Sequence, residues 1–297
     1  MVHKPVLLQE IVRGLDPKVG EVYLDGTINR GGHAKEIGKL LGKDGLVIGI
    51  DADEEALAEA KDNLSELDCQ VVLLQGNFRS MAEKIREAGV EQVDMILLDL
   101  GLSSDQLQDS GRGFTFQKDE PLLMTMSTKL ENYPFVARDI VNIWTKEHII
   151  DILQAYGEEQ FAEEIAAAII KARDEIEINK TGDLVKVIEE AVPSWYRHRK
   201  IHAATKTFQA LRMAVNDELG ALKDGMAGAW EILKPGGRLA IISFHSLEAR
   251  MVKIQFQAWA KGGEGTLITK HALKAKWEET KGNARARSAQ VRIISKN

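Results

Sequence analysis

Two spacings of apolar residues alternate along the first hundred positions of the chain. Four short apolar runs rich in β-branched residues predict strands, at 21–25, 46–51, 70–74 and 93–100. The segments between them have the apolar spacing of amphipathic helices, at 33–41, 54–67 and 80–88. Strands that alternate with helices predict an α/β fold, in which helices cover both faces of a mainly parallel sheet.

The alternation stops after Asp99. Residues 105–205 lack long apolar strands, and three helices are predicted there, at 147–157, 158–175 and 181–192. We therefore expect an inserted helical subdomain at 109–205, which recognises the substrate, between two parts of one sheet domain at 1–108 and 206–297.

The second part of the sheet domain resumes the earlier pattern. A long helix is expected at 206–233, followed by a turn at 234–237, a strand at 238–243 and a helix at 246–260. The last two strand candidates, at 265–269 and 289–295, are expected to pair antiparallel across a long connection.

Composition narrows the class of protein. With 297 residues, 44% hydrophobic and 28% charged, the chain resembles an ordinary globular protein. No apolar run approaches the roughly 20 residues of a membrane span, and the N-terminus has no signal-peptide pattern, so we expect a cytoplasmic protein without membrane contact. The single cysteine, Cys69, excludes an intramolecular disulfide and a cysteine-based zinc site, and no metal is expected.

The chain has a net charge of −6 but contains two segments in which basic residues predominate. Residues 266–297 contain eight Lys or Arg against two Glu, and 197–212 contain five with no acid. Both segments are candidates for contact with a polyanion such as RNA, through Arg197, Arg199, Lys200, Arg285 and Arg287. The alternative is that they are ordinary solvated surface.

A candidate cofactor site follows the first strand, in the sequence DGTINRGGH at 25–33. A strand that ends in Asp and turns through glycines into a helix is typical of nucleotide-like cofactor sites at the carboxyl edge of a parallel sheet. Asp51 ends the next strand, where a carboxylate binds ribose hydroxyls. The alternative is that Gly26, Gly31 and Gly32 only form a tight turn.

The spacing favours S-adenosylmethionine (AdoMet) over a dinucleotide. Asn29 and Arg30 interrupt the glycine pattern that binds pyrophosphate. AdoMet has no phosphate and carries a sulfonium cation, which suits the acidic residues Asp25, Asp51 and Asp99. A nicotinamide-dependent oxidoreductase on the same fold remains the rival.

Asp99, at the end of the fourth strand, is the candidate for the reacting centre. Enzymes that methylate exocyclic amines need hydrogen-bond acceptors there, because the amine lone pair is delocalised into the ring. Ser103 and Gln106 are candidates for completing the substrate or cofactor contacts; the alternative for Ser103 and Ser104 is a helix cap.

Phe244, His245 and Phe78 are further candidates for contact with the substrate or the cofactor. Phe244 is a candidate to stack on an extruded base, and His245 to contact that base or a phosphate. A histidine at a strand end is more often structural. Phe78 follows the third strand, where an adenine ring would lie in this fold, although core packing is the simpler interpretation.

The chain resembles, from end to end, the ribosomal RNA small-subunit methyltransferase H family, also called MraW. The matching segments include DGTINRGGH, ILLDLGLSSDQL, GRGFTF, IHAATKTFQALRMAVNDEL and LKPGGRLAIISFHSLEARMVK. The resemblance implies a Rossmann-like class I AdoMet methyltransferase that methylates N4 of a cytidine in the decoding region of 16S rRNA. It implies AdoMet contacts at Gly31, Gly32, His33, Asp51, Phe78, Asp99 and Gln106.

The chain departs from the family pattern in three places, at residue 29, at residue 203 and in the segment 119–126. Asn29 replaces a usual glycine, Ala203 a proline, and Leu123 and Thr125 an acid and an arginine in a loop expected to border the substrate. These departures keep a second hypothesis open, an RNA-binding ribosome-assembly factor that binds AdoMet with little turnover. The expected partner is 16S rRNA or the small ribosomal subunit, and the sequence does not decide between a monomer and a homodimer.

Overall fold

The computed structural model describes residues 5–102 and 110–297, which divide into two compact units. The sheet unit contains Met1–Gly101 and Leu219–Asn297, and the helical unit contains Leu102–Glu218. The predicted candidates Ser103 and Gln106 lie outside the described residues.

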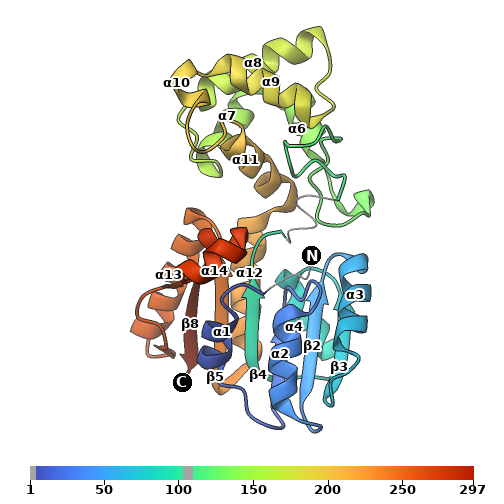
Figure 1. Cartoon of the computed structure of the whole chain (residues 1–297), viewed down its shortest axis with the longest axis vertical. Coiled ribbons are helices and arrows are strands. Elements are labelled where there is room, and N and C mark those ends of the chain that lie inside the picture. The colour runs from blue at the N-terminus through green and yellow to red at the C-terminus, as the bar shows by residue number, and fades with distance from the viewer. Residues whose placement is uncertain (1–4, 103–109) are drawn as a thin grey trace. The chain divides into compact units, whose positions relative to one another are not determined.

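One sheet organises the sheet unit (Figure 1), with the strand order β3-β2-β1-β4-β5-β8-β6 and β7 paired to β8. Its strands are β1 (Val22–Asp25), β2 (Leu46–Asp51), β3 (Gln70–Gln75), β4 (Val93–Asp99), β5 (Leu233–Ser243), β6 (Gly265–Leu267), β7 (Leu273–Lys274) and β8 (Gln290–Lys296). The first five are mutually parallel, and β8 runs antiparallel to β5, β6 and β7. The predicted pairing of the last strands is confirmed.

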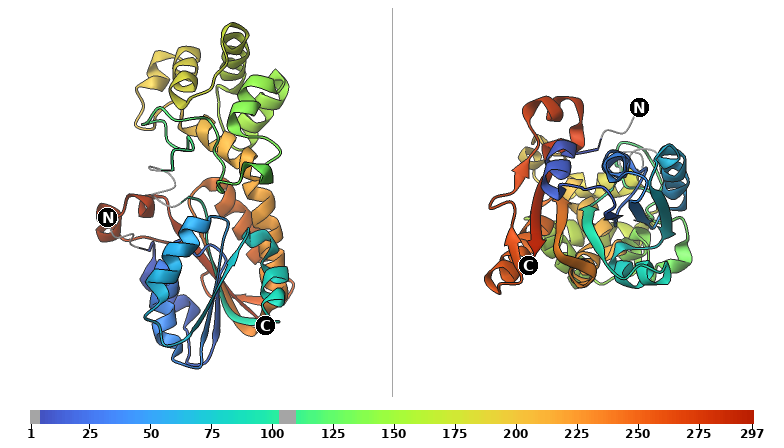
Figure 2. Two further views of the ribbon diagram at one scale, coloured as in Figure 1. Left: turned by 90° about the vertical axis from the view of Figure 1, so that its right-hand side faces the viewer. Right: turned by 90° about the horizontal axis from the view of Figure 1, so that it is seen from below.

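Helices cover both faces of this sheet, as Figure 2 shows. Because side chains alternate across a strand, Leu24 and Ile96 point into one core while Tyr23 and Leu97 point into the other. The first core packs against α4 (Met81–Glu87), α12 (Glu218–Ile232) and α13 (Ser246–Lys261). The second packs against α1 (Leu8–Leu15), α2 (Gly32–Leu41) and α3 (Glu54–Leu64).

The strand order reverses between β1 and β4. The chain leaves β1 toward β2 and β3, then returns to the other side of β1 as β4. Open α/β sheets bind ligands at the carboxyl ends of the strands at such a switch point. Asp25 ends β1 and Asp99 ends β4, so both carboxylates lie at this point.

Short helices complete the sheet unit. These are the 3-10 turn η1 (Phe78–Ser80), α14 (Trp277–Gly282) and the 3-10 turn η3 (Ala284–Arg287). The sequence analysis did not predict α1, α14 or β7, each of which has eight residues or fewer.

The helical unit has its own apolar core. Its helices are η2 (Leu130–Asn132), α6 (Ala137–Ile143), α7 (Lys146–Ala155), α8 (Ala162–Glu175), α9 (Thr181–Ala191), α10 (Ser194–Arg197) and α11 (Thr205–Asn216). The three predicted helices correspond to α7, α8 and α9. Among the described residues, no helix is long and apolar enough to cross a membrane.

The predicted helix at 206–233 is two helices. Asp217 adopts a left-handed conformation, with φ 45° and ψ 48°, which ends α11 before α12 begins at Glu218. Since α11 packs on α6 and α7, the compact helical unit extends to Glu218 rather than stopping at residue 205. Strand β5 also begins earlier than expected, because Leu233 already pairs with Val93 before a register shift.

Candidate active site

The turn after β1 is built around the carboxylate of Asp25, which is 2% exposed. Its Oδ2 accepts a hydrogen bond of 2.9 Å from the Tyr23 hydroxyl, and its Oδ1 accepts one of 3.2 Å from the Thr27 backbone N–H. Burial raises the pKa of Asp25 to about 6. These hydrogen bonds fix the backbone where the chain turns toward the switch point.

Asp51 connects the end of β2 to the same turn. Its Oδ2 accepts the backbone N–H of Asn29 and its Oδ1 that of Asp53, each at 2.9 Å. Each carboxylate oxygen keeps a second lone pair for a ligand hydroxyl. Burial also raises the pKa of Asp51 to about 6.

Asn29, where the family usually has glycine, has φ 48°. Asparagine tolerates this left-handed region better than most residues, so the substitution keeps the turn. Gly31, with φ 77°, precedes the first turn of α2. The predicted glycine turn into a helix is therefore present.

The side chain of His33 is engaged with the N-terminal segment. It is 6% exposed, and its Nε2 lies 2.8 Å from the carbonyl oxygen of Val6. Pro5 packs beside Gly32, and the Leu7 N–H donates to Glu279 Oε1 at 2.8 Å. In this structure His33 anchors the segment at Pro5–Leu7 beside the glycine turn, and its contact with AdoMet stays a prediction.

Asp99 is tied to the cofactor turn through its backbone. Its N–H donates to Thr27 Oγ1 at 2.6 Å, so β4 and the turn after β1 are joined at the switch point. Its side-chain oxygen Oδ1 is buried, and no donor among the described residues makes a hydrogen bond to it. Arg285 Nη2 lies 3.9 Å from Oδ1, close enough for an ion pair.

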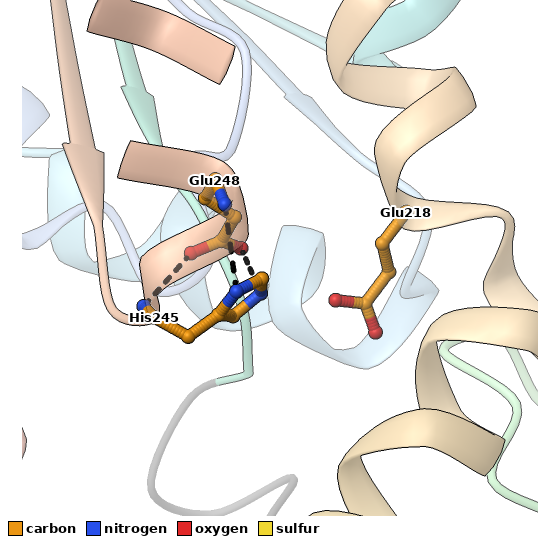
Figure 3. Close-up of side chains that lie close together, drawn as sticks. All are labelled: Glu218, His245 and Glu248. Atoms are coloured by element: carbon orange, nitrogen blue, oxygen red, sulfur yellow. Dashed lines mark hydrogen bonds and ion pairs between the residues drawn. The ribbon is translucent and has the colours of Figure 1, made fainter. Parts of the chain in front are cut away.

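His245 caps a helix. Its Nδ1 accepts the Glu248 N–H at 3.4 Å, while the Glu248 carboxylate accepts the N–H groups of Phe244 and His245. His245 Nε2 lies 3.2 Å from Glu248 Oε1, as Figure 3 shows. This reciprocal pair matches the structural interpretation of His245, and a catalytic role stays a prediction.

Figure 3 also draws Glu218, a residue of the helical unit. Its carboxylate accepts two hydrogen bonds from Arg212, of 2.7 and 2.9 Å. Glu218, His245 and Glu248 each have a partner in their own unit, and we assign no metal to them.

Phe78 begins η1 and packs against the core formed with α4 and α12. A Cβ added at Gly225 would lie 2.5 Å from Phe78 Cδ2, so only glycine leaves room for the ring there. This contact agrees with core packing, and a contact with adenine stays a prediction.

The basic residues of the helical unit follow α10. Arg197, Arg199 and Lys200 are exposed, and the Arg199 guanidinium lies 4.9 Å from the centroid of the Tyr196 ring. Trp195, which the sequence pattern did not single out, is 59% exposed beside them. Exposed aromatic and basic side chains together are typical of surfaces that bind single-stranded nucleic acid.

The two arginines predicted to contact RNA in the C-terminal segment, Arg285 and Arg287, differ in exposure. Arg287 is exposed, whereas the side chain of Arg285 is 14% exposed and its guanidinium lies 4.8 Å from the centroid of the Phe244 ring. Asp99, Phe244 and Arg285 thus form one group at the carboxyl ends of β4 and β5.

The loop that departs from the family pattern has a buried centre. Thr125 is fully buried, and its hydroxyl has no hydrogen-bond partner among the described residues. Asn216 holds the loop through the Met124 carbonyl and the Met126 N–H, at 2.7 and 3.0 Å. Thr125 therefore packs inside the helical unit, and whether its loop borders the substrate stays a prediction.

Comparison with known proteins identifies the family of this chain. A model of the MraW methylase family matches residues 1–297. The chain is 42% identical over 309 residues to "Ribosomal RNA small subunit methyltransferase H" of Symbiobacterium thermophilum, covering 99% of this chain and 96% of that protein. The protein of the same name from Geotalea daltonii is also 42% identical, covering 99% and 98%.

Among solved structures, a putative rRNA-methylase from Clostridium thermocellum covers 100% of both chains, at 14% identity and a TM-score of 0.45. The family model matches the whole chain, and each of the two relatives covers 99% of it. The chain belongs to the MraW methylase family.

Proposed function

We propose that this protein transfers a methyl group from AdoMet to N4 of a cytidine in the decoding region of 16S rRNA. The observation that carries the proposal is the buried Oδ1 of Asp99, an acceptor without a donor among the described residues, at the end of β4. Family membership and the names of the relatives support rRNA of the small subunit as the substrate.

The residues around the switch point suit AdoMet as the cofactor. Asp51 has spare lone pairs for ribose hydroxyls, and the acidic side chains of Asp25 and Asp99 suit a cation. The glycine turn at Gly31 brings the backbone close to a ligand. AdoMet supplies a methyl group bound to a positively charged sulfur.

Asp99 assists the amine of the substrate. The N4 lone pair is delocalised into the cytosine ring, and a carboxylate that accepts an N4–H hydrogen bond favours the pyramidal nitrogen that attacks. The new N–C bond forms as the C–S bond breaks, its electron pair stays on sulfur, and N4 releases one proton to solvent water. Holding both reactants in line contributes several kcal/mol to the acceleration.

The choice of N4 over C5 rests on cysteine chemistry. Methylation at pyrimidine C5 requires a thiolate adduct, and the only cysteine of the chain is Cys69. Cys69 directly precedes β3, at the amino end of that strand, whereas Asp99 lies at the carboxyl end of β4. No thiol of this chain serves the reaction, and the proposed transfer is direct and needs no metal.

The target cytidine must leave its stack to reach Asp99. In the proposed complex Phe244 stacks on the extruded base, and Arg197, Arg199 and Lys200 of the helical unit contact RNA phosphates. We assign the recognition of RNA outside the target base to residues 109–205. A cytoplasmic location agrees with an rRNA substrate.

Methyl transfer can be measured with tritium-labelled AdoMet on naked 16S rRNA, partly assembled particles and mature small subunits. Incorporation into at least one of them is expected. Calorimetry with AdoMet and NAD provides the binding control, and tight binding of NAD alone would contradict the proposal.

A second candidate is a ribosome-assembly factor that binds RNA and AdoMet without turnover. The departures at Leu123 and Thr125 are the observations that favour it. AdoMet binding with no incorporation into any of the three RNA substrates would support this candidate over the enzyme.

A further inference from the structure

Arg285 differs from an ordinary RNA-binding arginine in its surroundings. Its side chain is 14% exposed, that of Asp99 is 12% exposed, and Nη2 lies 3.9 Å from Asp99 Oδ1. A cation that binds a phosphate backbone is expected to reach into solvent. The side chain of Arg287, two residues later in the same turn, is exposed in this way. Arg285 instead points to the candidate reacting centre.

Three contacts fix the position of Arg285. Its guanidinium stacks over the Phe244 ring, with Cζ 4.8 Å from the centroid. Its backbone N–H donates to Asn283 Oδ1 at 3.2 Å, which caps η3. Ala286 and Ala289, which follow Arg285 in the chain, are buried in the core that Phe244 also contacts, so the turn is anchored.

The Phe244 ring is itself held in place. The Phe244 N–H donates to Glu248 Oε2 at 2.9 Å, in the first turn of α13. The Cδ2 edge of the ring also lies next to Gly101, where an added Cβ would be 3.7 Å from Phe244 Cδ2. Gly101 has φ 83° and follows Asp99 by two residues, so the ring and the carboxylate belong to one packed group.

The distance of 3.9 Å between Arg285 Nη2 and Asp99 Oδ1 is too long for a hydrogen bond, so Oδ1 keeps its lone pairs for another donor. The same distance is short enough for an ion pair, which orients the carboxylate. A carboxylate with a nearby cation and an unused acceptor oxygen is suited to receive an amine N–H.

We propose that Arg285 is a positioning residue for methyl transfer: stacked on Phe244, it orients the Asp99 carboxylate through an ion pair while leaving Oδ1 to the substrate amine. This inference rests on the proposed function. It removes Arg285 from the set of phosphate contacts and gives it a role that acts through Asp99.

The test compares Arg285→Met, which keeps the length and loses the charge, with Arg285→Lys and Arg287→Met. Single-turnover rates are measured at saturating AdoMet and RNA, together with KM for RNA, AdoMet affinity and thermal unfolding. For Arg285→Met we expect a rate about ten- to a hundredfold lower, with KM for RNA and AdoMet affinity within about threefold. Arg285→Lys is expected to recover part of the rate, and Arg287→Met to raise KM for RNA instead.

A double-mutant cycle separates positioning from a structural role. If Arg285 acts through Asp99, Arg285→Met lowers the rate by less than about threefold when Asp99→Asn is already present. Equal losses in both backgrounds would overturn the inference, as would a full rate for Arg285→Met with weaker, less salt-dependent RNA binding. Absence of transfer by the unaltered protein would contradict the proposed function itself, whereas transfer at full rate by Arg285→Met overturns this inference alone.

Discussion

The sheet unit and the helical unit present their polar residues in opposite ways. At the carboxyl edge of the sheet, Asp25, Asp51 and Asp99 are buried or nearly so and are held by backbone hydrogen bonds. On the helical unit, Arg197 and Lys200 are exposed. Fixed, desolvated groups suit chemistry, which needs defined geometry, and exposed cations suit a long polyanion.

Substitutions in the two units are therefore expected to change different properties. Substitutions at the sheet edge change the chemical step, AdoMet binding or the free energy of unfolding, because the groups are buried. Substitutions on the exposed basic surface change RNA binding and its salt dependence.

The largest effect is expected for Asp99→Asn. The amide keeps the shape but loses the charge that supports the amine, so we expect kcat to fall by about 100-fold or more. AdoMet affinity is expected to change by less than about threefold. Asp94→Asn, at the other end of β4 and paired with Lys234, is the matched control and should leave kcat unchanged. Equal rates for Asp99→Asn and the unaltered protein would remove Asp99 from the reaction.

Asp51→Ala should weaken AdoMet binding by about 1 to 3 kcal/mol, because ligand hydroxyls lose a charged partner. Calorimetry measures this change, and RNA affinity is expected to stay the same. Asp51→Asn keeps an acceptor for the N–H of Asn29 and should weaken AdoMet binding by less than Asp51→Ala does. Unchanged AdoMet affinity in Asp51→Ala would show that the ribose lies elsewhere.

Asp25→Asn should stabilise the protein without ligand at pH 7.5, by about 1 to 2 kcal/mol. The pKa of Asp25 is raised from 3.8 to about 6, so between these pH values the folded protein binds a proton that the unfolded chain does not. The free energy of unfolding therefore rises as the pH falls through this window, and the cost of the buried charge is complete above it.

Urea unfolding of Asp25→Asn between pH 4 and 8 measures this effect. The variant should have a shallower slope near pH 5, with Asp51 contributing what remains. Lower stability at pH 7.5 with a shallower slope would mean that the Tyr23 and Thr27 hydrogen bonds outweigh the buried charge. An unchanged slope would mean that Asp25 is not the group that titrates in this window.

The smallest effect is expected when Arg197, Arg199 and Lys200 are all changed to Ala. RNA affinity should fall, and the slope of log affinity against log salt should decrease by about 2, since each phosphate contact on a single strand contributes about 0.7. AdoMet affinity is expected to stay the same. A salt slope equal to that of the unaltered protein would exclude these residues from the RNA contact.

Much of the sheet edge could be predicted because the needed information is local. Apolar runs define where a strand ends, and this placed Asp51 and Asp99 at the ends of β2 and β4, as the structure confirms. The glycine turn could be predicted for the same reason. The break at Asp217 could not, because it depends on one residue adopting a left-handed backbone inside an otherwise helical pattern.

Contacts between distant residues had no signal in the sequence. Thr27 and Asp99 meet because β1 and β4 are neighbours in the sheet, and Arg285 reaches Asp99 only through the arrangement of β5 and β8. Basic composition alone placed Arg285 with the exposed arginines, and burial separates it from them. The burial of Thr125 likewise results from tertiary packing, for which the local sequence carries no signal.

The role of Asp99 in methyl transfer to the N4 amine of cytidine can be measured by mass spectrometry of nucleosides, from small-subunit rRNA incubated with the protein and isotope-labelled AdoMet. We expect label in N4-methylcytidine with the unaltered protein and at least about 100-fold slower labelling with Asp99→Asn. Label at C5 of a pyrimidine, on a ribose or on another base would contradict this expectation.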